Sequence, residues 1–354
     1  MLVIDLRSSL NLKKSRCCVR LLFVGDINLG EYYLTFGHGP RTTLETVDIF
    51  EDLRDIFKGA DVIAGNLEAS LTNNKLDINN PERVVLRGDP KKAEYLRSSG
   101  FNVLQVANNH TVQHGREGFD ETVEALRQSK ILPVGLAGQE MEVINVGGET
   151  VGFYAASDVP DNTNKKQLSY QKLDSHLIER IKKSVAKVDY LFVMFHWGLE
   201  ESTVPMDYQL ALIDELVEAG VTGIIGSHPH LFYEVWKQGN SIVAPSLGNF
   251  VFDLCWDHRL LKTGILDIVI DGNGLQAKVW PVEITQDGAV PRSVGVVQNV
   301  DDSLKLYDLG PSMEKQAIRK INYFIRNFFR GQVKLKAKFI LHKAINNLSV
   351  MIKR

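Results

Sequence analysis

The sequence predicts an α/β fold in which a buried sheet with helices outside packs on a second sheet. Three observations support this class. Short apolar runs alternate with amphipathic helical segments through the first two-thirds of the 354 residues. Short β segments follow one another in the next part of the chain. From about Pro311 the pattern changes to helical periodicity with many basic residues, which predicts a basic helical appendix.

The composition is that of an ordinary globular protein, with 44% hydrophobic and 24% charged residues and a net charge of −2. The three cysteines (Cys17, Cys18 and Cys255) form no disulfide framework, so a reducing compartment is expected. No apolar core of a signal peptide is present, and no stretch approaches the roughly 20 apolar residues of a spanning helix. These features predict a cytoplasmic protein without a transmembrane helix, with peripheral attachment to the inner face of the membrane as an open alternative.

Each expected strand is a short apolar run that ends at a polar residue or a glycine. A hairpin is predicted over residues 141–156, with Gly147-Gly148 as its turn. Further strands are predicted over residues 19–25, 61–64, 101–107, 190–195 and 221–225, and one starts at Val134.

The helices and the later β segments follow from the same patterns. A hairpin is predicted to pair residues 266–270 with residues 277–280. A loop is expected at residues 248–250. Helices are predicted over residues 44–57, 93–96, 118–129, 173–188 and 208–219, and short strands over residues 233–236 and 241–243.

Polar side chains stand at the ends of five apolar segments. Taken alone, a carboxylate there is usually a helix cap, and a histidine is more often a hydrogen-bonding residue than a ligand. The carboxyl ends of strands in an α/β sheet are, however, where ligands bind. Two carboxylates, an amide and several imidazoles form a mixed ligand set that suits Zn, Mn or Fe better than Ca or Mg. The segments end in Asp26, Glu68, Asn109-His110, His196 and His228/His230.

The stretch Ser227-His228-Pro229-His230 carries two of these imidazoles. In an extended segment, side chains two residues apart point to the same side. The proline between them restricts the backbone and adds no donor. This arrangement suits a pair of metal ligands or a phosphate clamp, and the alternative is a tight loop with incidental histidines.

Six short motifs follow one another between residues 19 and 285. They are Gly25-Asp26-Ile27-Asn28-Leu29-Gly30, Gly65-Asn66-Leu67-Glu68, Ala107-Asn108-Asn109-His110, His196-Trp197-Gly198-Leu199-Glu200, Gly226-Ser227-His228-Pro229-His230 and Ser246-Leu247-Gly248-Asn249-Phe250-Val251-Phe252-Asp253. In this order they resemble the motifs of the CapA family, the capsule and poly-γ-glutamate synthesis proteins related to calcineurin-like metallophosphoesterases. The resemblance implies a four-layer α/β/β/α sandwich over residues 19–300, with an N-terminal extension at 1–18 and a basic helical tail at 311–354.

The resemblance also implies a centre of two divalent metal ions (Mn, Fe or Zn). Asp26 and His230 would bind the first ion, and Glu68 would bridge the two ions. The second ion would be bound by Asn109, His196 and His228. His110 would be the catalytic residue, as a general acid or an anion stabiliser. The predicted substrate-binding residues are Asn28, Asn66, Asn108 and Asn249.

Two positions depart from the patterns of these families. Asn28 stands where the phosphoesterases usually have a histidine, and Gln113 stands where family members usually have an aspartate. A neutral amide at position 113 would weaken His110 as an acid. His114 next to it could compensate for the missing aspartate, but an exposed loop histidine is expected.

These features favour a metal-dependent hydrolase that acts on a phosphoester or a related anionic substrate in capsule or poly-γ-glutamate synthesis. The alternative is a non-catalytic accessory protein that binds the polymer during synthesis or export. The segment from Ser312 to Arg354 carries eleven basic residues and one acid. It would bind an anionic membrane, a polyanion or a synthase complex, or else form a helix pair packed on its own domain. No recognition motif accompanies the charge, so no nucleic acid is expected as a partner.

Overall fold

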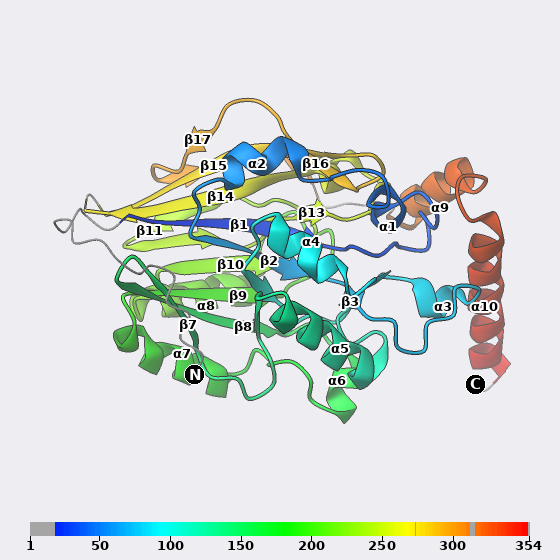
Figure 1. Cartoon of the computed structure of the whole chain (residues 1–354), viewed down its shortest axis with the longest axis horizontal. Coiled ribbons are helices and arrows are strands. Elements are labelled where there is room, and N and C mark those ends of the chain that lie inside the picture. Colours follow the sequence, from blue (N-terminus) through cyan, green and yellow to red (C-terminus); the bar gives the residue numbers. More distant parts are fainter. Residues whose placement is uncertain (1–17, 273, 312–315, 353–354) are drawn as a thin grey trace.

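The computed structural model describes residues 18–272, 274–311 and 316–352. These residues form two large sheets, with helices on the outer sides (Figure 1). The predicted mixed α/β class is confirmed. Apart from Cys18, the predicted N-terminal extension lies outside the described residues.

The first sheet has nine strands within the described residues. Strand β13 (Asn249–Val251) pairs beside β1, and β17 (Gln298–Asn299) pairs beside β15. The main path runs β16 (Val290–Ser293), β15 (Gly274–Thr285), β14 (Lys262–Asp271), β1 (Val19–Ile27), β2 (Val62–Leu67), β5 (Val103–Gln105) and β6 (Leu132–Val134).

The second sheet has seven strands in the same described part of the chain. Its order is β18 (Ser303–Leu304), β11 (Val235–Gln238), β12 (Ser241–Ala244), β10 (Gly223–Ser227), β9 (Tyr190–His196), β8 (Glu149–Ser157) and β7 (Glu142–Val146). The hairpin of β7 and β8 turns at Gly147-Gly148, as predicted. A small parallel pair, β3 (Ser70–Leu71) with β4 (Arg87–Gly88), stands apart.

The helices are mostly short. They are α1 (Pro40–Thr43), α2 (Arg54–Phe57), α3 (Pro81–Val84), α4 (Lys92–Ser98), α5 (Gly115–Gln128), α6 (Asn162–Lys166), α7 (Ser175–Ser184), α8 (Asp207–Glu218), α9 (Gln316–Asn327) and α10 (Val333–Ile352). Single 3-10 turns are η1 (Glu51–Leu53), η2 (Val185–Lys187) and η3 (His258–Leu261).

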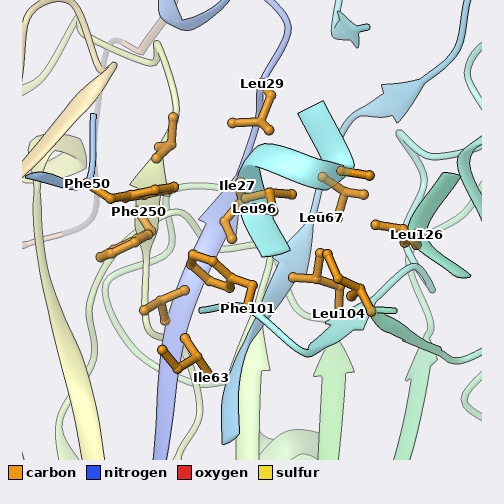
Figure 2. Close-up of a cluster of buried hydrophobic side chains, with 14 of the residues drawn as sticks. Ile27, Leu29, Phe50, Ile63, Leu67, Leu96, Phe101, Leu104, Leu126 and Phe250 are labelled. Atoms are coloured by element: carbon orange, nitrogen blue, oxygen red, sulfur yellow. The ribbon is translucent and has the colours of Figure 1, made fainter. Parts of the chain in front are cut away.

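The strands are apolar on both faces because both faces are buried. In β1, Leu21 and Phe23 join the core between the two sheets, whereas Leu22 and Val24 join the core under the helices of the first sheet. Strand side chains alternate between faces, so one apolar run fills two cores. Figure 2 shows the second of these cores, where Phe101 and Leu104 lie near Leu96 of α4. Each fully buried side chain of this size stabilises the fold by roughly 1.5–3 kcal/mol.

The second sheet uses the same alternation. Phe192 and Met194 of β9 face the core between the sheets, and Val193 packs with residues of α7 and α8 on the outer side. Because the two sheets share this core, they face each other. The core thereby fixes the strand ends of one sheet relative to those of the other.

The predicted single helix over residues 44–57 is wrong. Only η1 and α2 are helical there, and residues 44–50 form turns and irregular structure. The Asp48 carboxylate accepts hydrogen bonds from the Phe50 amide and the Tyr95 hydroxyl, and it pairs with Arg54. These bonds hold a turn where apolar spacing alone favours a helix.

Two smaller predictions also need correction. The strand expected to start at Val134 ends there, in β6. The expected loop at 248–250 contains the start of β13, which lies parallel to β1 with Asn249 opposite Asp26. This pairing joins residues distant in the chain, so local sequence does not indicate it.

The tail helices α9 and α10 pack on the body. Lys336 is fully buried and donates to the carbonyl oxygens of Asn327 and Arg330, and Leu335 enters an apolar cluster near the first sheet. Arg330 pairs with Asp287 at 2.6 Å. Among the described residues, no helix combines the length and the apolar character needed to cross a bilayer.

Candidate metal centre

Parallel pairing brings the polar strand ends together. In the first sheet Asp26 of β1 lies opposite Asn66 of β2, and Glu68 follows the end of β2. In the second sheet His196 of β9 lies opposite Ser227 of β10. Since the two sheets share one core, these ends meet at one edge, where Asp26, Glu68 and His196 are all fully buried.

The carboxylates are held by hydrogen bonds. Asn66 Nδ2 donates to Asp26 Oδ1 at 2.8 Å and to Glu68 Oε2 at 3.3 Å. The other oxygen of Asp26 lies 3.2 Å from His230 Nδ1. Both carboxylates therefore have fixed orientations before any ligand binds.

One oxygen of Glu68 remains without a hydrogen bond. Glu68 Oε1 is buried and has no donor within the described residues. Three imidazoles surround it: His196 Nε2 at 3.7 Å, His110 Nε2 at 3.9 Å and His230 Nε2 at 4.0 Å. These separations are too long for hydrogen bonds. An unpaired buried carboxylate oxygen facing several imidazole nitrogens is an arrangement that a metal cation would satisfy.

Two groups of side chains could hold an ion. Glu68, His228 and His230 form one, and Asp26, Glu68 and His196 form the other; within each group the ligand atoms lie within 4.8 Å of one another. Glu68 belongs to both, as a bridging ligand would. The histidines divide differently from the predicted assignment, so the assignment of each imidazole to one ion stays a prediction.

The Ser227-His228-Pro229-His230 stretch is not extended, which corrects the reason given for its two imidazoles. Strand β10 ends at Ser227, and φ is +96° at His228 and +61° at His230. Left-handed backbone is uncommon for residues other than glycine and costs on the order of 1–3 kcal/mol per residue. A tight turn, rather than strand alternation, brings the rings to a centroid separation of 6.1 Å.

Asn109 and His196, which were predicted to be ligands of the same ion, are in direct contact. Asn109 Oδ1 lies 3.0 Å from His196 Nε2. The other ring nitrogen, Nδ1, contacts the Ser227 hydroxyl at 3.1 Å and Asn66 Nδ2 at 3.2 Å. Contacts at Nδ1 orient the ring so that Nε2 faces the centre.

The pKa shifts agree with a cation-binding site. Burial and the Asp26 charge raise the pKa of Glu68 well above its ordinary value. Burial and the His228 imidazole lower the pKa of His196 well below its ordinary value, and burial with the His230 charge lowers that of His228 to about 4. Neutral imidazoles are the metal-binding form, and a cation would relieve the repulsion between the carboxylates. The residues present therefore fit a divalent metal.

The four asparagines predicted to bind substrate are all buried and bonded to the protein. Asn28 accepts from the Gly30 amide and donates to Asp253 at 3.0 Å. Asn108 donates to Asn66 Oδ1 and accepts from the amides of His110 and Thr111. Asn249 Oδ1 lies 2.9 Å from His230 Nδ1. These contacts place Asn66 and Asn249 directly behind the candidate ligands, with Asn108 behind Asn66.

His110 lies at the edge of the centre. Its Nδ1 is 2.9 Å from Gln113 Oε1, which can only accept, so this nitrogen carries the proton. Burial lowers the pKa of His110. The expectation of an exposed His114 is wrong: its side chain is buried, and Nε2 contacts the Val85 carbonyl at 2.8 Å.

Sequence reasoning missed two groups beside the centre. The imidazoles of His230 and His228 hold the pKa of Glu200 below its ordinary value, against burial that raises it. Lys320 of α9 also lowers that pKa, and its Nζ lies 4.4 Å from the Trp256 ring centroid. Glu200 ends one of the six motifs, which was a usable signal. Nothing in the sequence connected Lys320 with the centre.

Fold and site together define an α/β protein that gathers carboxylates, amides and imidazoles into a candidate metal centre where the strands end. The chain belongs to the family described as bacterial capsule synthesis protein PGA_cap, which matches residues 20–254 and is part of the metallophosphoesterase-like superfamily. The resemblance to the CapA family is thereby confirmed.

Two named relatives come from Bacillus. The PGA biosynthesis protein CapA of Bacillus subtilis (strain 168) is 27% identical over 282 residues, which are 76% of this chain and 72% of that protein. The capsule biosynthesis protein CapA of Bacillus anthracis is 30% identical over 278 residues, which are 70% of this chain and 66% of that protein.

Among solved structures, a 5'-nucleotidase from Candida albicans SC5314 aligns with a TM-score of 0.46 and 9% identity, over 87% of this chain and 57% of that one. A TM-score below 0.5 describes only partial agreement between two backbones.

Proposed function

We propose that this protein is a metal-dependent hydrolase with two divalent ions, acting on a phosphoester or a related anionic substrate. The observation that carries the proposal is the buried, unpaired Glu68 Oε1, which faces His110, His196 and His230. A structural role for this oxygen would leave a buried charge without a partner, which is unfavourable. The proposed fold is the four-layer α/β/β/α sandwich of residues 19–300, followed by the tail at 311–354.

Asp26, Glu68, Asn109, His196, His228 and His230 would hold the ions, which we propose to be Mn, Fe or Zn. Bound ions would supply Lewis-acid polarisation of a phosphoryl oxygen. The chain's own contribution is to fix the ligands: Asn66 orients both carboxylates, Ser227 orients His196, and Asn249 orients His230. We propose this positioning role for the buried asparagines in place of direct substrate binding.

His110 is the residue placed to move a proton. With Nδ1 donating to Gln113, the neutral ring presents Nε2 as an acceptor toward the centre. Burial lowers the pKa of His110, and the hydrogen bond with Gln113 raises it only in part. An aspartate at position 113 would add a negative charge and favour the charged ring more strongly than this neutral amide does. His110 would therefore act first as a proton acceptor. It would donate to an anion or a leaving group only after gaining a proton from the substrate or water.

The biological setting follows from the relatives. Proteins named for capsule and PGA biosynthesis align with most of this chain. We propose that the substrate or ligand is an anionic polymer or its precursor, such as poly-γ-glutamate, handled together with a synthase. A non-catalytic accessory role is the alternative, favoured by the absence of a charged partner for His110 at position 113.

The deciding experiment measures metal content and then turnover. Protein purified without chelators should contain divalent metal and hydrolyse an aryl phosphate when Mn²⁺ is supplied. The variant His110→Ala should keep its metal and lose about 10²–10⁴-fold in rate, the range typical of a lost proton-transfer group. A protein that holds two ions but turns over no phosphoester would favour the accessory role, and one that holds none would refute the centre.

We also propose peripheral attachment to an anionic membrane through α9. Ile318, Ile321 and Ile325 are each more than half exposed on one face of this helix, beside basic residues. An exposed apolar stripe flanked by bases is suited to the surface of an anionic bilayer. Ile321→Glu should reduce binding to anionic liposomes, whereas the control Val296→Glu, at another exposed site, should not. Equal binding of both variants and the native protein would refute the attachment.

A further inference from the structure

A surface pocket of about 630 Å³ lies beside the metal centre. It is lined by residues before and within α3, by the start of α5, and by α6 with its following residue. Gln113 belongs to this lining, and its side chain contacts His110, whose ring faces Glu68. The pocket and the centre are thus separated by one side-chain contact.

The lining is basic. Lys75, Arg83 and Arg116 face a single acid, Glu117. Lys75 pairs with Glu117 at 2.6 Å, and Arg116 pairs with Asp120 at 2.7 Å. Arg83 is exposed and has no ion-pair partner in the part of the chain that the structure describes. At least one cation is therefore free to bind an incoming anion.

A buried guanidinium stands behind this lining. Arg87 is 2% exposed; its Nη1 donates to the Asn74 carbonyl, while Nε and Nη2 have no acceptor among the described residues. It is in electrostatic contact with Arg83 and His114, both of which line the pocket. An acid in electrostatic contact with it, Glu121, is already bonded to Thr72 and to the amides of Asn73 and Asn74.

The first turn of α5 adds to the positive potential. This 14-residue helix begins at Gly115, and His114 before it provides no side-chain cap. Uncapped amides at a helix N-terminus attract anions. The unpaired guanidinium nitrogens of Arg87 and the free Arg83 are donors without acceptors in this region. The Gly115 amide already bonds to the Val112 carbonyl, so the N-terminus of α5 contributes mainly its helix dipole.

We infer that this pocket binds a carboxylate of a polyanionic ligand whose neighbouring group lies at the metal centre. Guanidinium groups bind carboxylates with paired, charge-assisted hydrogen bonds. A ligand with a single negative charge would occupy only the metal centre. A second, basic pocket next to the centre is therefore suited to a polymer that carries negative charges at repeated positions. The inference rests on the proposed function, because it takes the anionic polymer as the ligand of the same site.

The test uses the full chain and a fluorescent, γ-linked oligoglutamate, with binding followed by anisotropy. The double variant Lys75→Gln/Arg83→Gln should bind the oligomer about tenfold more weakly or worse, since one charge-assisted hydrogen bond is worth at least that factor. The loss should shrink as salt is added. Monomeric glutamate, used as a competitor, should not distinguish the variant from the native protein.

Two further variants separate the pocket from general effects of charge or folding. Lys183→Gln/Lys187→Gln removes the same charge from an exposed surface around α7 and should leave oligomer binding unchanged. Glu117→Gln removes the acid that pairs with Lys75 and should strengthen oligomer binding, an effect that a damaged fold would not produce.

Equal affinity of the native protein and Lys75→Gln/Arg83→Gln for the oligomer would overturn the inference. Metal content, measured on the same samples, distinguishes this failure from that of the proposed function. A protein without metal whose oligomer binding still depends on Lys75 and Arg83 would refute the hydrolase and keep the pocket.

Discussion

The two sides of the candidate metal centre are built in different ways. The first sheet supplies oxygen atoms from Asp26 and Glu68, at and just beyond the ends of β1 and β2. The pairing register of β1 shifts near Asp26, but neither residue has left-handed backbone, and we call this the regular side of the centre. The second sheet supplies His196 at the end of a regular strand, but His228 and His230 from left-handed backbone. Strand geometry therefore positions the carboxylate oxygens. The nitrogens of His228 and His230, in contrast, are positioned only while the surrounding residues hold the backbone in its strained, left-handed conformation.

The strained side depends on the regular side. The Asp26 carboxylate lies 3.4 Å from the His228 amide and 3.2 Å from His230 Nδ1. Residues in left-handed conformations persist only when their surroundings hold them. A change on the oxygen side should therefore affect both sides, and a change on the nitrogen side should stay local.

The largest effect is expected for Glu68→Gln. Glu68 belongs to both groups of candidate ligands, and an amide carries no charge to balance an ion. We expect loss of both ions, with a decrease in affinity of more than about 100-fold, beyond the range seen when only a supporting residue is lost. Metal analysis by mass spectrometry measures this. Glu201→Gln is the matched control, because Glu201 is also buried but lies outside both groups.

The same variant gives a metal-free readout. The pKa of Glu68 is raised in the folded protein, so its contribution to stability is full below the unfolded value of about 4.3 and is lost as the pH rises through the higher folded value. Without metal, the free energy of unfolding of the native protein should fall relative to that of Glu68→Gln as the pH rises above about 4.3, because His196, His228 and the other buried groups titrate in both proteins. If the free energies of unfolding of the two proteins changed with pH in parallel, the pKa of Glu68 would not be raised by burial.

The regular side could be predicted from the sequence, and the strained side only in part. Asp26 and Glu68 follow apolar runs with clear strand character, so their meeting was expected. His228 and His230 were predicted to lie side by side because of an extended backbone, which is the wrong reason. No pattern of residues predicts left-handed backbone at a residue other than glycine.

The fold shows the same limit. Local periodicity predicted most strands and helices but not β13, whose pairing with β1 is long-range. It also missed the turn at Asp48, which the distant Tyr95 stabilises. The burial of His114 depends on a contact with Val85, which no local pattern indicates. Contacts between residues distant in the chain determine all three features: the pairing of β13, the turn at Asp48 and the burial of His114.

A smaller, one-sided effect is expected for His228. His228→Ala should lower the metal content while the carboxylates keep their orientation. His228→Gly should lose metal equally but be more stable than His228→Ala by about 1 kcal/mol, because glycine adopts a φ of +96° without strain. Thermal unfolding of the two variants measures the difference. The exposed His258→Ala is the control for loss of an imidazole, and unchanged metal content in His228→Ala would remove His228 from the ligand set.

The smallest effect is expected for Asn66→Ala, which removes the amide that joins the two sides. Asn66 Nδ2 contacts Asp26, Glu68 and His196, yet its amide is not itself among the candidate ligands. Its loss should weaken metal affinity by about 10–100-fold without abolishing binding, as is usual for residues that orient ligands. A competitive titration with a chelator of known affinity measures this change.

The control is Asn102→Ala. Asn102 lies just before β5, and its side chain bonds to Ile63 and Asp61 at the other end of β2. It should cost stability but leave metal affinity unchanged. If Asn66→Ala lowers stability and leaves affinity intact, as Asn102→Ala should, the two sides are independent and the centre is assembled by the strand ends alone. If Asn66→Ala abolishes binding, the amide is a ligand, and the oxygen side includes Asn66 beside Asp26, Glu68 and Asn109.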